Sequence, residues 1–74
     1  MVYSLLEEAL KEYILYGAPI LVFVENNLVT IKANSYVINL DFFNGKVENV
    51  WFNGSLIPLS IEEKYDITIL TMVL

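Results

Sequence analysis

Carboxylates are the side chains in this sequence best suited to chemistry, because paired carboxylates act as general acids and bases and bind hard cations. They occur on an expected helix face, at an expected helix start and beside an expected hairpin: Glu7, Glu8 and Glu12; Glu62 and Glu63; Asp41 and Glu48. None of these groups has the ligand spacing of a calcium loop. The sequence therefore predicts solvated surface charge, with no catalytic residue and no metal site.

Nucleophilic catalysis has few candidate groups in this chain. There is no Cys and no His, so the chain lacks a thiolate nucleophile, an imidazole base for a serine, and the usual zinc ligands. The three glycines are explained by one helix end and two turns, which leaves no glycine-rich phosphate loop. We therefore expect a protein that is not an enzyme and that has no cofactor.

Aromatic residues near expected turns indicate a contact surface. Phe42 and Phe43 lie at one turn, and Trp51 and Phe52 lie beside a hairpin. Exposed aromatic side chains are common anchors of protein interfaces, although aromatics also fill cores. Together with an uncharged C-terminal segment, they give a candidate interface of seven residues: Phe42, Phe43, Trp51, Phe52, Leu70, Met72 and Leu74.

Composition favours self-association. Hydrophobic residues make up 57% of the chain, against about 45–50% in typical domains. A chain of 74 residues has a thin core, so the apolar surplus is expected to be buried against a second copy or another protein. The partner is therefore expected to be the protein itself, as a homodimer or larger assembly, with another protein as a further possibility.

Net charge argues against nucleic acid as a partner. The chain carries −5, with nine acidic residues, four lysines and no arginine, whereas nucleic-acid binding depends on Lys and Arg. The longest apolar runs, Ile20–Val24 and Ile69–Leu74, fall short of the roughly 20 residues of a membrane span. Acidic residues stand where a signal peptide would be positive. We expect a cytoplasmic protein, in keeping with the absence of Cys.

Local patterns predict one helix followed by strands. A capping box at Ser4 and Glu7, with Gly17 and Pro19 at the other end, predicts a helix over about 4–16. Alternating apolar residues and Asn-rich turns then predict strands at about 20–25, 28–33, 36–41, 46–52, 55–59 and 66–73. Imperfect alternation in 46–52 indicates either a bulge or two partly covered faces. Ser60 to Glu63 repeats the capping-box spacing, which allows one helical turn before the last strand.

These elements predict a single α+β domain over 1–74, in which the N-terminal helix packs on an antiparallel sheet of four to six strands, mainly in meander order. The alternative is a small barrel closed by the last strand. The stretch LLEEALKEYILYGAPILVFVENN resembles the helix, loop and first strand of the Sm-like and SH3-like barrels. This resemblance covers about a third of the chain, and the glycine that bends the second strand of an Sm-like barrel has no counterpart between Leu28 and Ala33. No functional residues are carried over from it.

The leading functional hypothesis is a non-enzymatic structural or protein-interaction module that acts as a homo-oligomer. An alternative is an acidic regulator that occupies a basic, nucleic-acid-binding partner protein. A third is a small-ligand carrier or an enzyme.

The first strand, 20–25, is apolar at nearly every position, which is typical of a strand covered on both faces. The predicted N-terminal helix can cover only one face of this strand, so its second face would need barrel closure or a second subunit.

Overall fold

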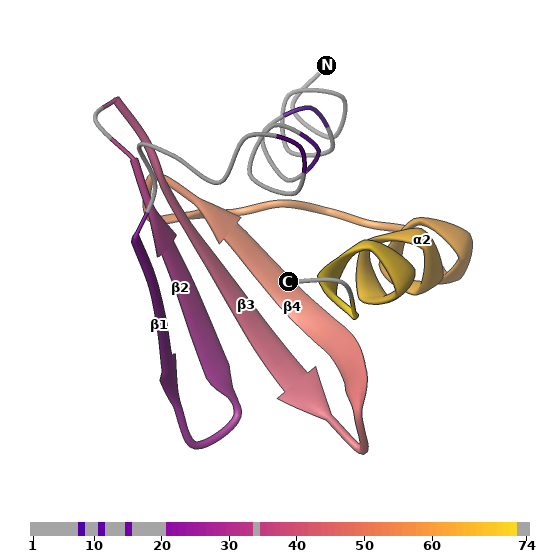
Figure 1. The fold of residues 1–74 in the computed structure, drawn as a ribbon. Helices are drawn as coiled ribbons and strands as arrows, with labels where there is room; N and C mark the ends of the chain where they lie inside the picture. Colours follow the sequence, from indigo (N-terminus) through magenta and orange to yellow (C-terminus); the bar gives the residue numbers. More distant parts are fainter. Residues whose placement is uncertain (1–7, 9–10, 12–14, 16–20, 34, 73–74) are drawn as a thin grey trace.

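The computed structural model describes residues 8, 11, 15, 21–33 and 35–72. Five antiparallel strands follow one another in a meander, in the order β1-β2-β3-β4-β5, and a helix comes after them (Figure 1). The elements are β1 (Leu21–Glu25), β2 (Leu28–Lys32), β3 (Val37–Phe43), β4 (Lys46–Phe52), β5 (Ser55–Leu56) and α2 (Ile61–Thr71).

Tight turns join the strands where Asn and Gly occur in the sequence. Asn44–Gly45 and Asn53–Gly54 each place both residues at positive φ, between 50° and 84°, as a type I′ hairpin turn requires. Asn26 also has a positive φ, of 55°. Asn tolerates this left-handed region better than other residues with a side chain, and Gly enters it freely. These turns fix the strand register.

A register shift between Asp41 and Phe42 of β3 explains the irregular alternation of β4. Val47 pairs with Phe42, whereas Val50 pairs with Leu40, so one extra β4 residue lies between the two pairs. Both valines therefore reach the same face and are buried. Of the two explanations that the sequence left open for β4, the structure shows the bulge.

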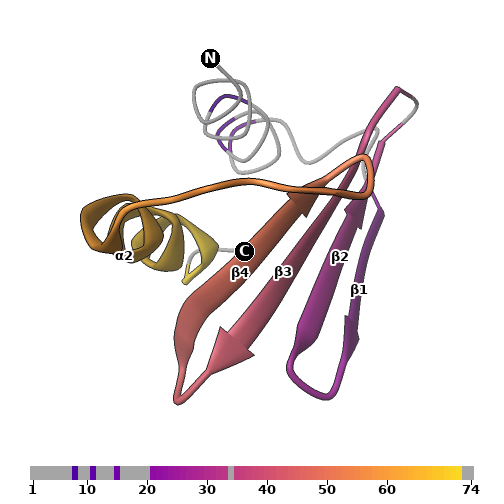
Figure 2. The same ribbon diagram turned by 180° about the vertical axis from the view of Figure 1, so that it is seen from behind.

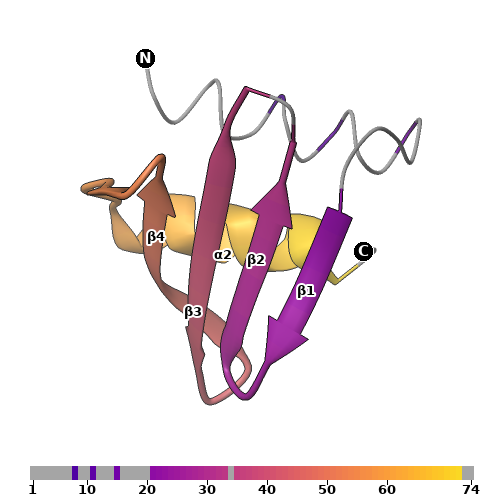
Figure 3. The same cartoon turned by 90° about the vertical axis from the view of Figure 1, so that its left-hand side faces the viewer.

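The core lies between one face of the sheet and α2. Its buried members come from β2, β3, β4, the segment after β5, and α2: Ile31, Ile38, Leu40, Val47, Val50, Ile57 and Ile67. Figure 3 shows α2 crossing behind the sheet. The other face of the sheet points away from this helix, and that leaves it outside the core.

The predicted fold was wrong about which segment supplies the packing helix. Residues 61–71 form α2, where the sequence predicted a strand at about 66–73. The capping box is complete: the Ser60 side chain accepts from the Glu63 N–H, and the Glu63 carboxylate accepts from the Ser60 N–H. The sequence allowed one helical turn at this capping box. In the structure the helix continues for about three turns, and the chain does not return to the sheet as a strand.

The predicted N-terminal helix, 4–16, lies mostly outside the described residues. Of that segment, Glu8, Lys11 and Leu15 have helical backbone and exposed side chains. The predicted strand 55–59 is shorter, at Ser55–Leu56. The barrel alternative is also wrong for the described strands, because β1 and β5 stand at opposite ends of an open sheet.

Thr68 of α2 protects the outer edge of β4. Its hydroxyl accepts a hydrogen bond from the Val47 N–H at 2.9 Å and donates one to the Lys64 carbonyl at 2.7 Å. Farther along β4, the Ile57 N–H donates to the Val50 carbonyl at 2.9 Å. Figure 2, seen from behind, shows the chain leaving the end of β4 and coming back toward that strand as α2. This edge is thus satisfied by the chain itself.

Candidate interaction surface

The sheet face turned away from α2 carries exposed apolar side chains that the described elements leave uncovered, and we call it the open face. Residues paired across antiparallel strands point to the same side, so the register defines its members. They are Leu21, Phe23, Glu25, Leu28, Thr30, Lys32, Val37, Asn39, Asp41, Phe43, Lys46, Asn49, Trp51 and Leu56. Figure 3 looks onto this face, with α2 on the far side.

A single row of paired residues crosses the open face from one edge of the sheet to the other. It runs Phe23, Thr30, Asn39, Trp51, Leu56, with one residue from each strand. Phe23 and Leu56 are more than half exposed, while the three residues between them are half-buried. Apolar side chains at both ends and a polar centre make this row suited to contact with another protein surface.

The charged residues of the open face lie toward its two ends. Lys32 lies at one end, in the row of Leu21 and Val37. Glu25 and Asp41 lie at the other end, in the row of Leu28 and Asn49, where Asn49 Nδ2 donates to Asp41 Oδ2 at 3.4 Å. The open face thus carries Glu25 and Asp41 in one row, Lys46 beside Phe43 beyond that row, and Lys32 at the opposite end.

Asn39 leaves an acceptor unsatisfied at the centre of the face. Its Oδ1 is buried and has no hydrogen-bond partner among the described residues. A buried acceptor without a partner costs about 1–3 kcal/mol relative to one that remains hydrated. This position is therefore not optimised for the stability of a single chain.

Replacing Asn39 with Val should raise the free energy of unfolding by about 1 kcal/mol, because Val removes the unpaired acceptor and suits a strand. Urea denaturation followed by the fluorescence of the single tryptophan, Trp51, measures this change. The control is Asn49→Val, which removes the Asn49–Asp41 hydrogen bond and should give no gain. Equal gains in both variants would show that strand propensity alone is responsible.

The seven candidate interface residues separate in the structure. Phe43 and Trp51 lie on the open face. Phe42, Phe52 and Leu70 pack against the core, where the Phe52 ring stacks on Tyr36 with centroids 5.8 Å apart. Met72 is exposed beside the end of α2, and Leu74 lies outside the described residues.

Sequence reasoning missed the exposed apolar residues of β1 and β5. Leu21 and Phe23 are 61% and 54% exposed, and Val24, on the opposite face of β1, is 69% exposed. Leu56 is similarly exposed. The available signal was the continuous apolar run of the first strand, which indicated two covered faces but not that the strand lies at an edge.

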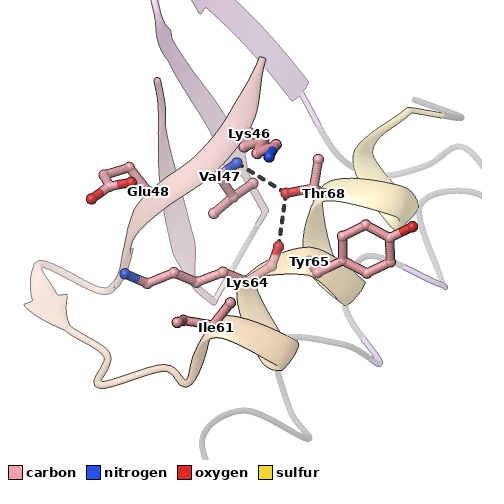
Figure 4. Close-up of a pocket in the computed structure, with 7 residues that line it drawn as sticks. All are labelled: Lys46, Val47, Glu48, Ile61, Lys64, Tyr65 and Thr68. Carbon is pink, nitrogen blue, oxygen red and sulfur yellow. Dashed lines mark hydrogen bonds between the residues drawn. The ribbon is translucent and has the colours of Figure 1, made fainter. Parts of the chain in front are cut away.

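A groove of about 300 Å³ separates α2 from the start of β4 (Figure 4). It is lined by Lys46, Val47, Glu48, Ile61, Lys64, Tyr65 and Thr68. The Lys64 ammonium extends away from Thr68, and Lys46 and Glu48 lie on different sides of β4 (Figure 4). The charged groups do not converge on one point, and the buried hydroxyl among these lining residues, that of Thr68, is engaged in holding the helix to β4.

The described part of the chain has neither clustered metal ligands nor a membrane-spanning helix. No three acidic side chains there are grouped closely enough to hold a metal ion. The helical stretches there are too short or too polar to cross a membrane. Comparison with known proteins gave no match to a family model, a curated protein or a solved structure.

Proposed function

We propose that this chain is a non-enzymatic protein-interaction module that acts as a homo-oligomer, with the open face and the β1 edge as its contact surface. The observation that carries the proposal is the exposure of β1. Its sequence, LVFVE, has the composition of a strand covered on both faces, yet β1 is the first strand of an open sheet. Three of its four apolar side chains are more than half exposed.

Exposure of this kind disfavours an isolated chain. An apolar edge strand is a template for pairing with another chain, and natural sheets usually protect such edges with charge, proline or a bulge. The only charge in β1 is Glu25, at its end, and no proline or register shift lies within it. Burial of these side chains against a second copy would remove them from water.

Location in the cytoplasm is part of the same proposal. A chain without cysteine has no need of an oxidising compartment. The expected role is that of a small building block or adaptor whose activity is contact, with no chemistry of its own.

Light scattering coupled to size-exclusion chromatography tests the proposal. The wild-type protein should be a dimer or larger at micromolar concentration. Phe23→Thr should weaken the association at least about tenfold, which corresponds to about 1.4 kcal/mol, because it removes a half-exposed aromatic from the proposed contact while keeping a strand-forming residue.

The matched control is Ile61→Thr, which removes an even more exposed apolar side chain from α2, away from the open face. This variant should associate like the wild type. A wild-type protein that stays monomeric up to about 100 micromolar, far above the dissociation constants of stable complexes, would refute the proposal.

A further inference from the structure

The direction of the backbone groups in β1 follows from one hydrogen bond in the neighbouring strand pair. The Asn27 carbonyl accepts from the Phe42 N–H at 2.8 Å, across the β2–β3 pair. In an antiparallel ladder the hydrogen-bonding direction alternates from residue to residue. Leu28, Thr30 and Lys32 therefore direct their backbone groups away from β3 and toward β1.

The same alternation fixes the outer edge of β1. Leu21, Phe23 and Glu25 pair with Lys32, Thr30 and Leu28, so these three β1 residues use their N–H and C=O groups to bond β2. Val22 and Val24 consequently direct theirs outward. No other described strand pairs with that side of β1.

The two edges of the sheet are thus unequal. The β4 edge is covered by β5, by the Ile57 N–H on the Val50 carbonyl, and by the Thr68 hydroxyl on the Val47 N–H. The β1 edge offers the unpaired backbone groups of two valines between exposed apolar side chains. An extended strand is the ligand that satisfies such groups.

We propose that β1 pairs antiparallel with β1 of a second copy, with Phe23 opposite Phe23, so that the two sheets become one continuous sheet. This inference rests on the proposed function, since it assigns the geometry of the self-association. In this register all five residues of β1 overlap, and Val22 exchanges N–H···O=C bonds with Val24 of the second copy. Centring the pairing on either valine would shorten the overlap.

Charge complementarity identifies the occupant as a second copy. The Phe23-centred register places Glu25 of one chain opposite Leu21 of the other, and Leu21 pairs with Lys32 in its own sheet. Because neighbouring strands lie about 4.8 Å apart, the Glu25 and Lys32 backbones would be about 10 Å apart on the same face, within reach of two long side chains. Two-fold symmetry repeats the pair, and the two Glu25 carboxylates stay at opposite ends of the junction.

Hydrogen exchange on the wild-type protein tests the pairing directly. The Val22 and Val24 N–H groups have no strand partner among the described residues of the single chain and are bonded in the proposed dimer, whereas those of Phe23 and Glu25 are bonded in both. Residue-resolved exchange should therefore slow at least about tenfold at Val22 and Val24 when the protein is concentrated through its association range, with little change at Phe23 and Glu25.

A proline variant gives the second measurement. Val24→Pro removes an N–H that the single chain does not use, and proline is tolerated on the outer side of an edge strand. It should stay folded by circular dichroism and associate about tenfold to a hundredfold more weakly than Val24→Thr, which keeps the N–H. If Val24→Pro does not fold, Val24→Lys replaces it, because an edge lysine also opposes strand pairing.

The outcomes separate this inference from the proposed function. A wild-type protein that is monomeric at all concentrations overturns both. An oligomer in which the Val22 and Val24 amides exchange as fast as in the monomer overturns the edge pairing, while association through the open face stands. Slowed exchange at those two amides, with weaker association in the proline or lysine variant, supports the pairing.

Discussion

Replacing Ile67 with Ala is expected to lower the free energy of unfolding by about 2–5 kcal/mol, whereas Ile69→Ala should change it by less than about 1 kcal/mol. Ile67 is fully buried in the core between α2 and the sheet, and Ile69, two residues later, is 44% exposed. Truncation of a buried isoleucine loses its transfer free energy and leaves a cavity, while truncation of the exposed one leaves none. Urea denaturation followed by Trp51 fluorescence gives both values.

This pair of variants also distinguishes a helix from a strand over 66–73. Residues two apart lie on the same face of a strand but on different faces of a helix. A strand would therefore give Ile67→Ala and Ile69→Ala similar costs, and such a result would contradict α2 and its packing. A small domain has a total stability of about 5–15 kcal/mol, so Ile67→Ala should also expose a measurable unfolded population.

The antiparallel meander was predictable because its signals are local. Three of the four connections between the described strands carry Asn-Asn or Asn-Gly between runs of strand-forming residues. Asn26, Asn44, Gly45, Asn53 and Gly54 take the positive φ values that such turns need. Turn chemistry of this kind fixes both where a strand ends and how it pairs with the next. The alternation of β4 also indicated the register shift at Asp41. Val47 and Val50 are three residues apart, so they reach the same face only if β4 has an extra residue between them.

The C-terminal helix was not predictable from alternation. Residues 67–74 alternate between two sides that are both largely apolar, which a strand and a helix satisfy equally well. Apolar residues on α2 also point outward: Ile61, Tyr65 and Ile69 are exposed. Because of these outward-facing residues, the segment lacks the single apolar stripe that is typical of an amphipathic helix. The capping box at Ser60 was the decisive signal, and β-branched residues after it favoured the wrong element.

The candidate surface was only partly visible in the sequence. The apolar run of the first strand indicated that its two faces need cover, but sheet order decides which strand stands at an edge, and sheet order depends on long-range packing. Phe43 and Trp51 were identified from their places beside turns, while Phe23 and Leu56 were not. Phe23 and Leu56 come to lie in one row with Trp51 only when the five strands are aligned, so no local sequence pattern could reveal this row.

Replacing Thr68 with Val is expected to lower the free energy of unfolding by about 1–3 kcal/mol, the cost of leaving the buried Val47 N–H without its acceptor. Val keeps the size and branching of Thr, so the change isolates the hydroxyl. Thr68→Ser is the matched control, because it retains the hydroxyl. Thr71→Val is a second control, since the Thr71 hydroxyl bonds only within α2. Denaturation measures stability, and the Val47 amide should exchange faster in Thr68→Val alone.

The same substitution should change how the protein associates. With the β4 edge covered, pairing through β1 joins two chains and then ends, because the pair is two-fold symmetric and has no further open edge. Freeing the Val47 N–H leaves one unpaired backbone donor on the β4 edge, and an edge with an unpaired group can pair with a further chain. Thr68→Val should therefore form species larger than those of the wild type at equal concentration, and Thr68→Ser should not. Unchanged assembly in Thr68→Val, together with faster exchange at Val47, would show that the Thr68 hydroxyl stabilises the fold without limiting edge growth.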